Sequence, residues 1–135
     1  MNFENVLREG KAKRIMPSQI KASSLFKSSI QAIETAKLIP LNINTSKTIL
    51  RELYEGLREY CEALGLLNGY KFLNHESIVY FLRDVLNEPI YKKFDRYRKL
   101  RNGINYYGED INIETVKAAM EEIPMLIKAL EKHRK

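Results

Sequence analysis

The sequence contains a single cysteine, Cys61, and no tryptophan among its 135 residues. One cysteine cannot form an internal disulfide, which excludes a disulfide-stabilised scaffold and a zinc site built from clustered cysteines. Only two histidines, His75 and His133, are present, which excludes most histidine-rich metal sites. The sequence therefore predicts neither a metal site nor a bound cofactor.

Long apolar runs are also missing. No stretch approaches the roughly 18 consecutive apolar residues that indicate a transmembrane helix. The first ten residues contain charged side chains and lack the apolar segment of a signal peptide. With a single thiol, these absences favour a cytoplasmic protein. The length fits one domain over residues 1–135, since domains usually contain about 100–200 residues.

The positive charge is concentrated in two parts of the chain. The sequence has 23 Lys and Arg against 17 Asp and Glu, a formal net charge of +6. Residues 91–108 contain six basic side chains and one acidic side chain, and residues 1–37 carry a further excess. A charged helix face in water is one interpretation. The interleaved tyrosines and arginines of residues 91–108 favour a second one, because such side chains stack on bases and contact phosphates.

Apolar residues recur at helical spacing along most of the chain. We expect five helices, and no stretch shows a strand pattern. Residues 1–16 are expected to form a short helix or an arm. Pro124 is expected to kink or restart the last helix, because proline removes a backbone donor. The predicted fold is all-α, an antiparallel up-and-down bundle of about five helices. Its helices lie approximately at residues 18–39, 46–68, 74–86, 90–107 and 112–130.

Few side chains match an enzyme template. There is no glycine-rich phosphate loop and no nucleophile elbow. Cys61 lies on the apolar stripe of the second helix, which predicts a buried, inert thiol. His75 follows Asn74 at a predicted helix start, so it either packs in the loop or transfers protons. His133 lies in a basic tail, and we expect no specific role for it.

Arg101 is the most unusual residue of the basic fourth helix, because it borders the apolar stripe that runs from Ile90 to Tyr107. An arginine at such a position must be paired or must face a groove. Arg98 and Asn105 share its helix face at spacings of three and four. With Lys99, these residues are the predicted nucleic-acid-binding set: Arg98, Lys99, Arg101 and Asn105. The alternative is an internal polar network that fixes the register of the bundle or a dimer interface.

The same helix contains a motif of a known family. The run Arg101-Asn102-Gly103-Ile104-Asn105-Tyr106 has the spacing of the Arg-polar-x-x-x-His motif of the HEPN superfamily, with Tyr106 at the histidine position. Other segments are similar to an uncharacterised archaeal branch of this family, so the resemblance covers nearly the whole chain. These segments are residues 17–18, 53–59, 69–72, 75–76, 95–100 and 107–108.

The resemblance implies a helical homodimer in which the Arg and His positions of two subunits meet in a cleft. It also implies metal-independent ribonuclease activity and a nucleotidyltransferase partner protein, as in toxin–antitoxin pairs. The implied catalytic residues are Arg101, Asn102 and Tyr106. A tyrosine with an ordinary pKa near 10 is a poor general base at neutral pH. We therefore expect a homodimeric RNA- or nucleotide-binding module. The alternatives are a ribonuclease that uses Arg101, Asn102 and Tyr106, and a purely structural interaction module.

Overall fold

The computed structural model describes residues 1–135 and contains six α-helices. The predicted all-α helical bundle is confirmed: α2 to α6 are the five expected helices, and α1 is a short helix within residues 1–16. The elements follow in the order α1 (Phe3–Arg8), β1 (Ala12–Arg14), α2 (Gln19–Leu38), α3 (Ser46–Leu67), β2 (Tyr70–Phe72), α4 (Glu76–Asp84), α5 (Tyr91–Tyr107), α6 (Ile113–Leu130) and the 3-10 helix η1 (Glu131–His133).

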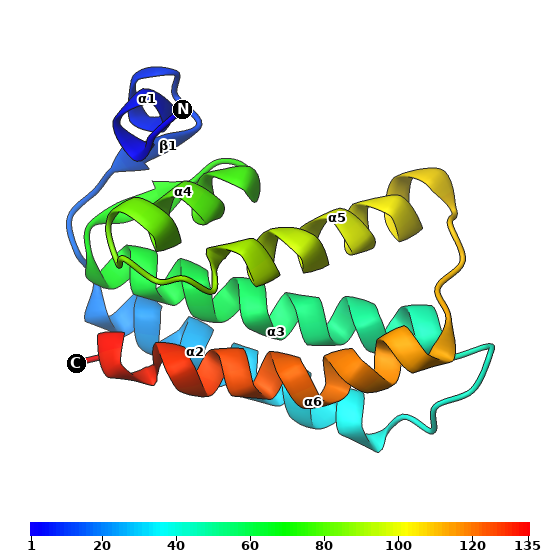
Figure 1. The fold of residues 1–135 in the computed structure, drawn as a ribbon. Helices are drawn as coiled ribbons and strands as arrows, with labels where there is room; N and C mark the ends of the chain where they lie inside the picture. Colours follow the sequence, from blue (N-terminus) through cyan, green and yellow to red (C-terminus); the bar gives the residue numbers. More distant parts are fainter.

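Helix α3 lies at the centre of the bundle. It packs against α2, α4, α5, α6 and β2, and the long helices α2, α3, α5 and α6 alternate in direction along the chain (Figure 1). Its inward residues are fully buried, including Leu53, Tyr54, Leu57, Cys61 and Leu64. The most regular apolar stripe of the sequence therefore forms the core, and the neighbouring helices cover it.

Two short strands form a small antiparallel sheet, so the expectation that the chain has no strand is wrong. β1 pairs with β2, and Lys13 lies opposite Lys71 in the register. Each strand has only three residues, too few to show an alternating pattern in the sequence. The sheet lies beside α1 and α4 at one end of the bundle (Figure 1).

Local capping interactions set the helix boundaries. The side chains of Ser18, Asn74 and Asn112 each accept a hydrogen bond from the backbone N–H three residues later, at 3.2, 2.9 and 2.9 Å. Gly69 and Gly108 follow the ends of α3 and α5 with φ of 82° and 62°, a region that glycine adopts without strain. Asn74 thus marks the start of α4 and Gly108 the end of α5, and the candidate site lies between those two helices.

The structure decides two details of the sequence analysis. Of the kink or restart expected at Pro124, the restart is wrong, because α6 continues through Pro124, and the nearby residues Ile123, Leu126 and Ile127 are buried. Tyr107 is 78% exposed although the stripe placed it inward. It is the last residue of α5, and this end of the helix projects from the bundle (Figure 1).

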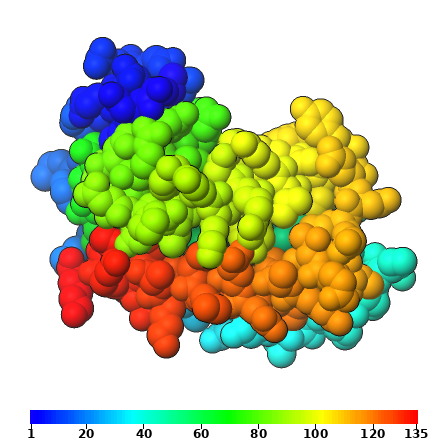
Figure 2. Space-filling view, in the orientation of Figure 1, coloured from blue at the N-terminus to red at the C-terminus, as the bar shows by residue number.

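The space-filling view shows α5 and α6 lying side by side over one face of the molecule (Figure 2). None of the helices combines the length and the apolar character needed to cross a lipid bilayer.

Candidate ligand-binding site

A cavity of about 450 Å³ lies between the start of α4 and one face of α5. It combines the loop that follows β2, the first turn of α4 and the second half of α5. Polar residues form most of its wall: Leu73, Asn74, His75, Glu76, Arg98, Arg101, Asn102 and Tyr106.

Arg101 is the cavity's unpaired cation. The side chain is half-buried, and no carboxylate lies within 4.0 Å of its guanidinium. Its contacts are Asn102 Oδ1, which accepts a hydrogen bond from Nη1 at 3.4 Å, and the rings of Tyr54 and Tyr106, whose centroids are 5.8 and 6.0 Å away. Such stacking orients a guanidinium and leaves its N–H donors available to a ligand.

Arg98 is held by two carboxylates. Its Nε donates to Asp95 Oδ1 at 2.8 Å, and its Nη2 lies 3.7 Å from Glu76 Oε2. The side chain is only 14% exposed. Because its charge is balanced within the structure, Arg98 joins α5 to the first turn of α4 and fixes the shape of the cavity.

His75 brings an imidazole to the same cavity from the residue before α4. Its Nδ1 lies 3.0 Å from the hydroxyl of Tyr54, a fully buried residue of α3. Burial raises the pKa of Tyr54 above its ordinary value, so this hydroxyl keeps its proton. The pair therefore connects α3 to the start of α4 at the back of the cavity.

The environment of His75 favours the neutral imidazole. Burial lowers its pKa to about 4, and the positive charges of Arg58 and Arg101 act in the same direction. His75 is thus uncharged at neutral pH. Arg101 therefore meets no second positive charge from this residue.

The hydrogen bond to Tyr54 also determines the tautomer of His75. The Tyr54 hydroxyl has His75 Nδ1 as its one hydrogen-bond partner, and a buried donor left unpaired is costly. We therefore assign Tyr54 as the donor and Nδ1 as the acceptor. The imidazole proton is then on Nε2, which makes His75 a neutral hydrogen-bond donor on its other edge.

Tyr106 forms the outer wall of the cavity and is 69% exposed. Its ring lies beside the guanidinium of Arg101, one turn earlier on α5. An exposed aromatic ring next to an unpaired arginine offers a stacking surface together with a positive charge.

The structure brings part of the predicted site together in this cavity. Arg98, Arg101, Asn102 and Tyr106 line the cavity, whereas two predicted binding residues lie outside it. Lys99 is 70% exposed and pairs with Asp95 at 3.2 Å. Asn105 Oδ1 accepts a hydrogen bond at 2.7 Å from Nε of Arg51 on α3.

The sequence analysis named His75 as a residue of loop packing or proton transfer but did not assign it to the site on α5, nor did it assign its neighbours Asn74 and Glu76. The signal for His75 was its position after Asn74 at a predicted helix start. No spacing rule connects that position with α5, because the packing of α4 on α5 brings the two together.

The other reactive side chains lie away from this cavity. Cys61 is fully buried, and burial raises the pKa of its thiol, in agreement with an inert core cysteine. The expectation that His133 has no specific role is wrong, because its Nε2 lies 2.6 Å from Oε2 of the buried Glu88. The structure brings together no cluster of three His, Cys, Asp or Glu side chains able to hold a metal ion.

Comparisons of the chain with protein-family models, with curated proteins and with solved structures found no match.

Proposed function

We propose that this chain is a HEPN-like helical domain that binds single-stranded RNA in the cavity between α4 and α5. The observation that carries the proposal is the half-buried Arg101, which lines the cavity without a carboxylate partner. Retaining an unbalanced cation at such a site is costly unless an anion compensates for it. A phosphate group would supply that anion.

The aromatic residue beside Arg101 supports a single strand as the ligand. Proteins that bind single strands combine cationic side chains with exposed aromatic rings on which bases stack. Tyr106, which is 69% exposed, provides such a ring within the cavity. A mononucleotide would fill the same cavity, so we include it as a competing ligand in the test.

Five of the cavity residues have a role in the proposed complex. Arg101 contacts a phosphate, and Tyr106 stacks on a base. Asn102 and the Nε2–H of His75 donate hydrogen bonds to phosphate oxygens or base edges. Arg98 holds α4 against α5 and acts on the ligand indirectly, because Asp95 and Glu76 already balance its charge.

The test is fluorescence anisotropy with a labelled single-stranded RNA of roughly 12 nucleotides, within the size range of such sites. We expect binding that weakens with salt and an Arg101→Gln variant that loses about tenfold in affinity. A lost phosphate contact should also reduce the steepness of the log–log salt dependence by about 0.7. Tyr106→Ala should weaken binding in every sequence tested, since base stacking contributes about 1–3 kcal/mol.

Two variants serve as matched controls. Arg8→Gln removes a positive charge from the exposed end of α1, and Tyr107→Ala removes an exposed tyrosine that does not line the cavity. Absence of RNA binding at low salt, or equal losses in Arg8→Gln and Arg101→Gln, contradicts the proposal. If AMP competes as well as RNA does, the ligand is a nucleotide.

His75 supports a second candidate function, a metal-independent ribonuclease. A histidine in the cavity supplies a proton-transfer group that Tyr106 alone does not offer. Transfer at Nε2 would require the Nδ1 proton to face Tyr54, the reverse of the assigned tautomer. For this reason we place binding first and cleavage second.

Cleavage is tested by incubating the chain with single-stranded RNA and mixed tRNA in EDTA. A ribonuclease of this type would produce fragments, and His75→Gln, Arg101→Gln and Tyr106→Phe would each slow their formation. Intact RNA after prolonged incubation excludes this candidate while leaving RNA binding unaffected.

The partners implied by the family resemblance complete the proposal: a second copy of the chain and a nucleotidyltransferase protein. Sedimentation equilibrium tests self-association directly, and a mass of twice 15.8 kDa is the expected result.

The remaining candidate function is a purely structural module. It predicts that Arg101→Gln shifts the melting temperature or the mass of the assembly and changes no ligand affinity.

A further inference from the structure

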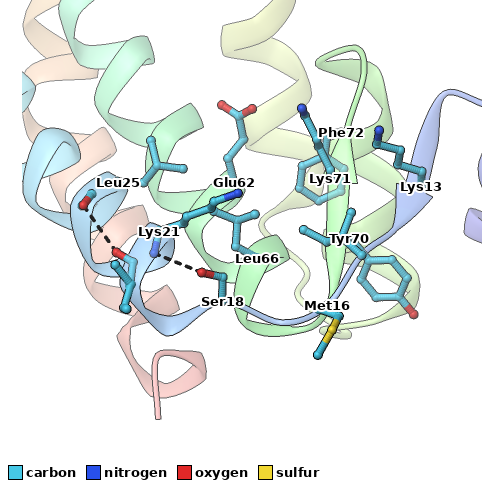
Figure 3. Close-up of a pocket in the computed structure, with 13 residues that line it drawn as sticks. Lys13, Met16, Ser18, Lys21, Leu25, Glu62, Leu66, Tyr70, Lys71 and Phe72 are labelled. Carbon is cyan, nitrogen blue, oxygen red and sulfur yellow. Dashed lines mark hydrogen bonds between the residues drawn. The ribbon is translucent and has the colours of Figure 1, made fainter.

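A second cavity, of about 650 Å³, lies between the start of α2, the end of α3 and the two-stranded sheet. Figure 3 shows it in close-up, with Lys13 and Lys71 on the sheet side and Lys21 on the helix side. We call it the sheet groove. It does not include Arg101, His75 or Tyr106 and is separate from the proposed RNA site.

The three lysines of the sheet groove have no acidic partner. No carboxylate lies within 4.0 Å of Lys13, Lys21 or Lys71, and all three are exposed. The basic residues on either side of Lys13 are paired, Lys11 with Glu9 at 3.5 Å and Arg14 with Glu4 at 3.3 Å. Among Lys11, Lys13 and Arg14, only Lys13, which lines the groove, is thus left unpaired.

Two of these lysines directly oppose each other. Lys13 and Lys71 are register partners in the antiparallel pair, so their side chains share one face of the sheet. Like charges in this arrangement destabilise a sheet. Glu62, which also lines the groove, shares Arg58 with Glu55 and is ion-paired to none of the three lysines. An anionic occupant would remove this repulsion.

Apolar side chains form the rest of the groove. Leu25, Leu66 and Phe72 line its interior, and Met16 and Ile20 lie at its edge. Met16 is 87% and Ile20 is 84% exposed. Exposed apolar side chains surrounded by charges are typical of protein interaction sites.

From these observations we propose that the sheet groove binds an acidic segment of a partner protein, with an apolar side chain of that segment seated on Leu25 and Leu66. Carboxylates on either side of this anchor would pair with Lys13, Lys21 and Lys71.

Three other occupants fit the groove less well. A small amphiphile would leave the outward-facing Met16 and Ile20 uncovered. RNA would lack an exposed stacking ring, because Phe72 is only 8% exposed and Tyr70 packs against Phe3 at 4.9 Å between ring centroids. A second copy of a chain with net charge +6 would bring like charges together.

The probe is a fluorescent synthetic peptide of about 12 residues in which Asp and Glu surround a central Leu-Phe pair. The matched peptides replace the acids with Lys or the Leu-Phe pair with Ser. Only the parent peptide should bind with measurable affinity. In NMR spectra of the labelled protein, the shifted amides should be those of residues around Met16, Lys21, Leu66 and Lys71.

Charge-reversal variants of the protein provide the second part of the binding test. Lys21→Glu and Lys71→Glu should each weaken peptide binding by about two- to fivefold or more, as expected for exposed charge pairs. Lys128→Glu, at an exposed position of α6 away from the groove, is the matched control. Both groove variants should retain RNA binding at the Arg101 cavity.

Any of four results would overturn the inference. They are no peptide binding at millimolar concentration, equal affinity for the peptide without acids, binding of dodecanoate with none of the peptide, and RNA-induced amide shifts in the groove that persist in Arg101→Gln. A dimer that Lys71→Glu dissociates would assign the groove to a second copy and would equally reject the acidic partner.

Discussion

The hydroxyl of Tyr54 and Nδ1 of His75 lie 3.0 Å apart, and the same Tyr54 ring lies 5.8 Å from the guanidinium carbon of Arg101. One buried tyrosine of α3 thus positions a neutral imidazole from α4 and a cation from α5. Because α3 lies at the centre of the bundle, the positions of these cavity side chains depend on the most buried part of the fold.

The first prediction concerns the titration of His75. Removing the positive charge of Arg101 makes protonation of the imidazole easier, so Arg101→Gln should raise the pKa of His75 from about 4. The pKa should stay below the ordinary 6.5 or so, since burial is its largest cause. NMR of the imidazole C2 proton measures it, with Arg8→Gln as the control. A wild-type His75 that titrates near 6.5 would refute the described environment.

The second prediction is a pH-dependent stability. Between about pH 6.5 and pH 4 the unfolded chain binds a proton at His75 that the folded chain does not bind. Stability from this group is therefore complete above that window and is lost as the pH falls through it. The difference in melting temperature between the wild type and His75→Gln should narrow from pH 8 to pH 4.5. Other titrating groups are common to both proteins, so a difference that stays constant would contradict the assignment.

The third prediction concerns Glu88, which holds the end of the chain. Burial would raise its pKa, but hydrogen bonds from His133 and Lys132 outweigh burial and lower it. The carboxylate is 5% exposed and lies 2.6 Å from His133 Nε2 and 3.2 Å from Lys132 Nζ. Glu88→Gln should reduce the free energy of unfolding by about 1–3 kcal/mol.

Urea unfolding at pH 7 measures this change. Glu121→Gln, at an exposed position of α6 with no ion pair, should change the stability little and is the matched control. Because the pKa of Glu88 is lowered, its contribution is present above the ordinary glutamate pKa and disappears in acid. Equal stabilities of the two variants would show that the Glu88 contacts contribute nothing.

The fourth prediction tests the contact between α2 and α3. Gly56 accepts a hydrogen bond of 2.6 Å from Ser29 Oγ, and a Cβ at Gly56 would lie 2.7 Å from Ile33 Cδ1. Alanine gains about 1 kcal/mol in helix propensity, whereas overpacking costs about 1–3 kcal/mol. We expect Gly56→Ala to lower the melting temperature, because the backbone oxygen of Ser29, 3.0 Å from the added Cβ, cannot yield easily.

A double variant separates the two effects. Ile33→Val removes the nearest clashing methyl, so Gly56→Ala should cost less in that background than in the wild type. Equal costs in both backgrounds would show that Ile33 does not oppose the added methyl group.

The sequence predicted the helices well because their signals are local. The helices expected to begin near residues 18 and 112 are α2 and α6, which Ser18 and Asn112 cap, and Gly69 follows the end of α3 with a positive φ. The two strands were not predicted, because α2 and α3 separate β1 from β2 along the chain. A local sequence pattern does not indicate pairing between segments so far apart.

The site was predicted only along one helix. Spacing on α5 placed Arg98 and Arg101 on one face, and both line the cavity. By helical spacing Asn105 lies on the same face, but its side chain accepts a hydrogen bond from Arg51 of α3 and does not line the cavity. Gly103 lies on the same helix, and the side chain of Glu109 lies over it, 2.6 Å from where a Cβ would be. His75 required the packing of a different element.

The carbonyl of Lys11 accepts hydrogen bonds from the backbone of Leu73 at 2.9 Å and from the hydroxyl of Ser77 at 2.7 Å. The segment beside β1, which forms the wall of the sheet groove, thereby clamps the loop and first turn that carry His75. A partner that displaces β1 on binding would move one side of the Arg101 cavity. The two surfaces would then be thermodynamically linked, each ligand changing the affinity of the other by the same factor. RNA titrations with and without the acidic peptide measure that factor, and a value of one would show that the clamp transmits nothing.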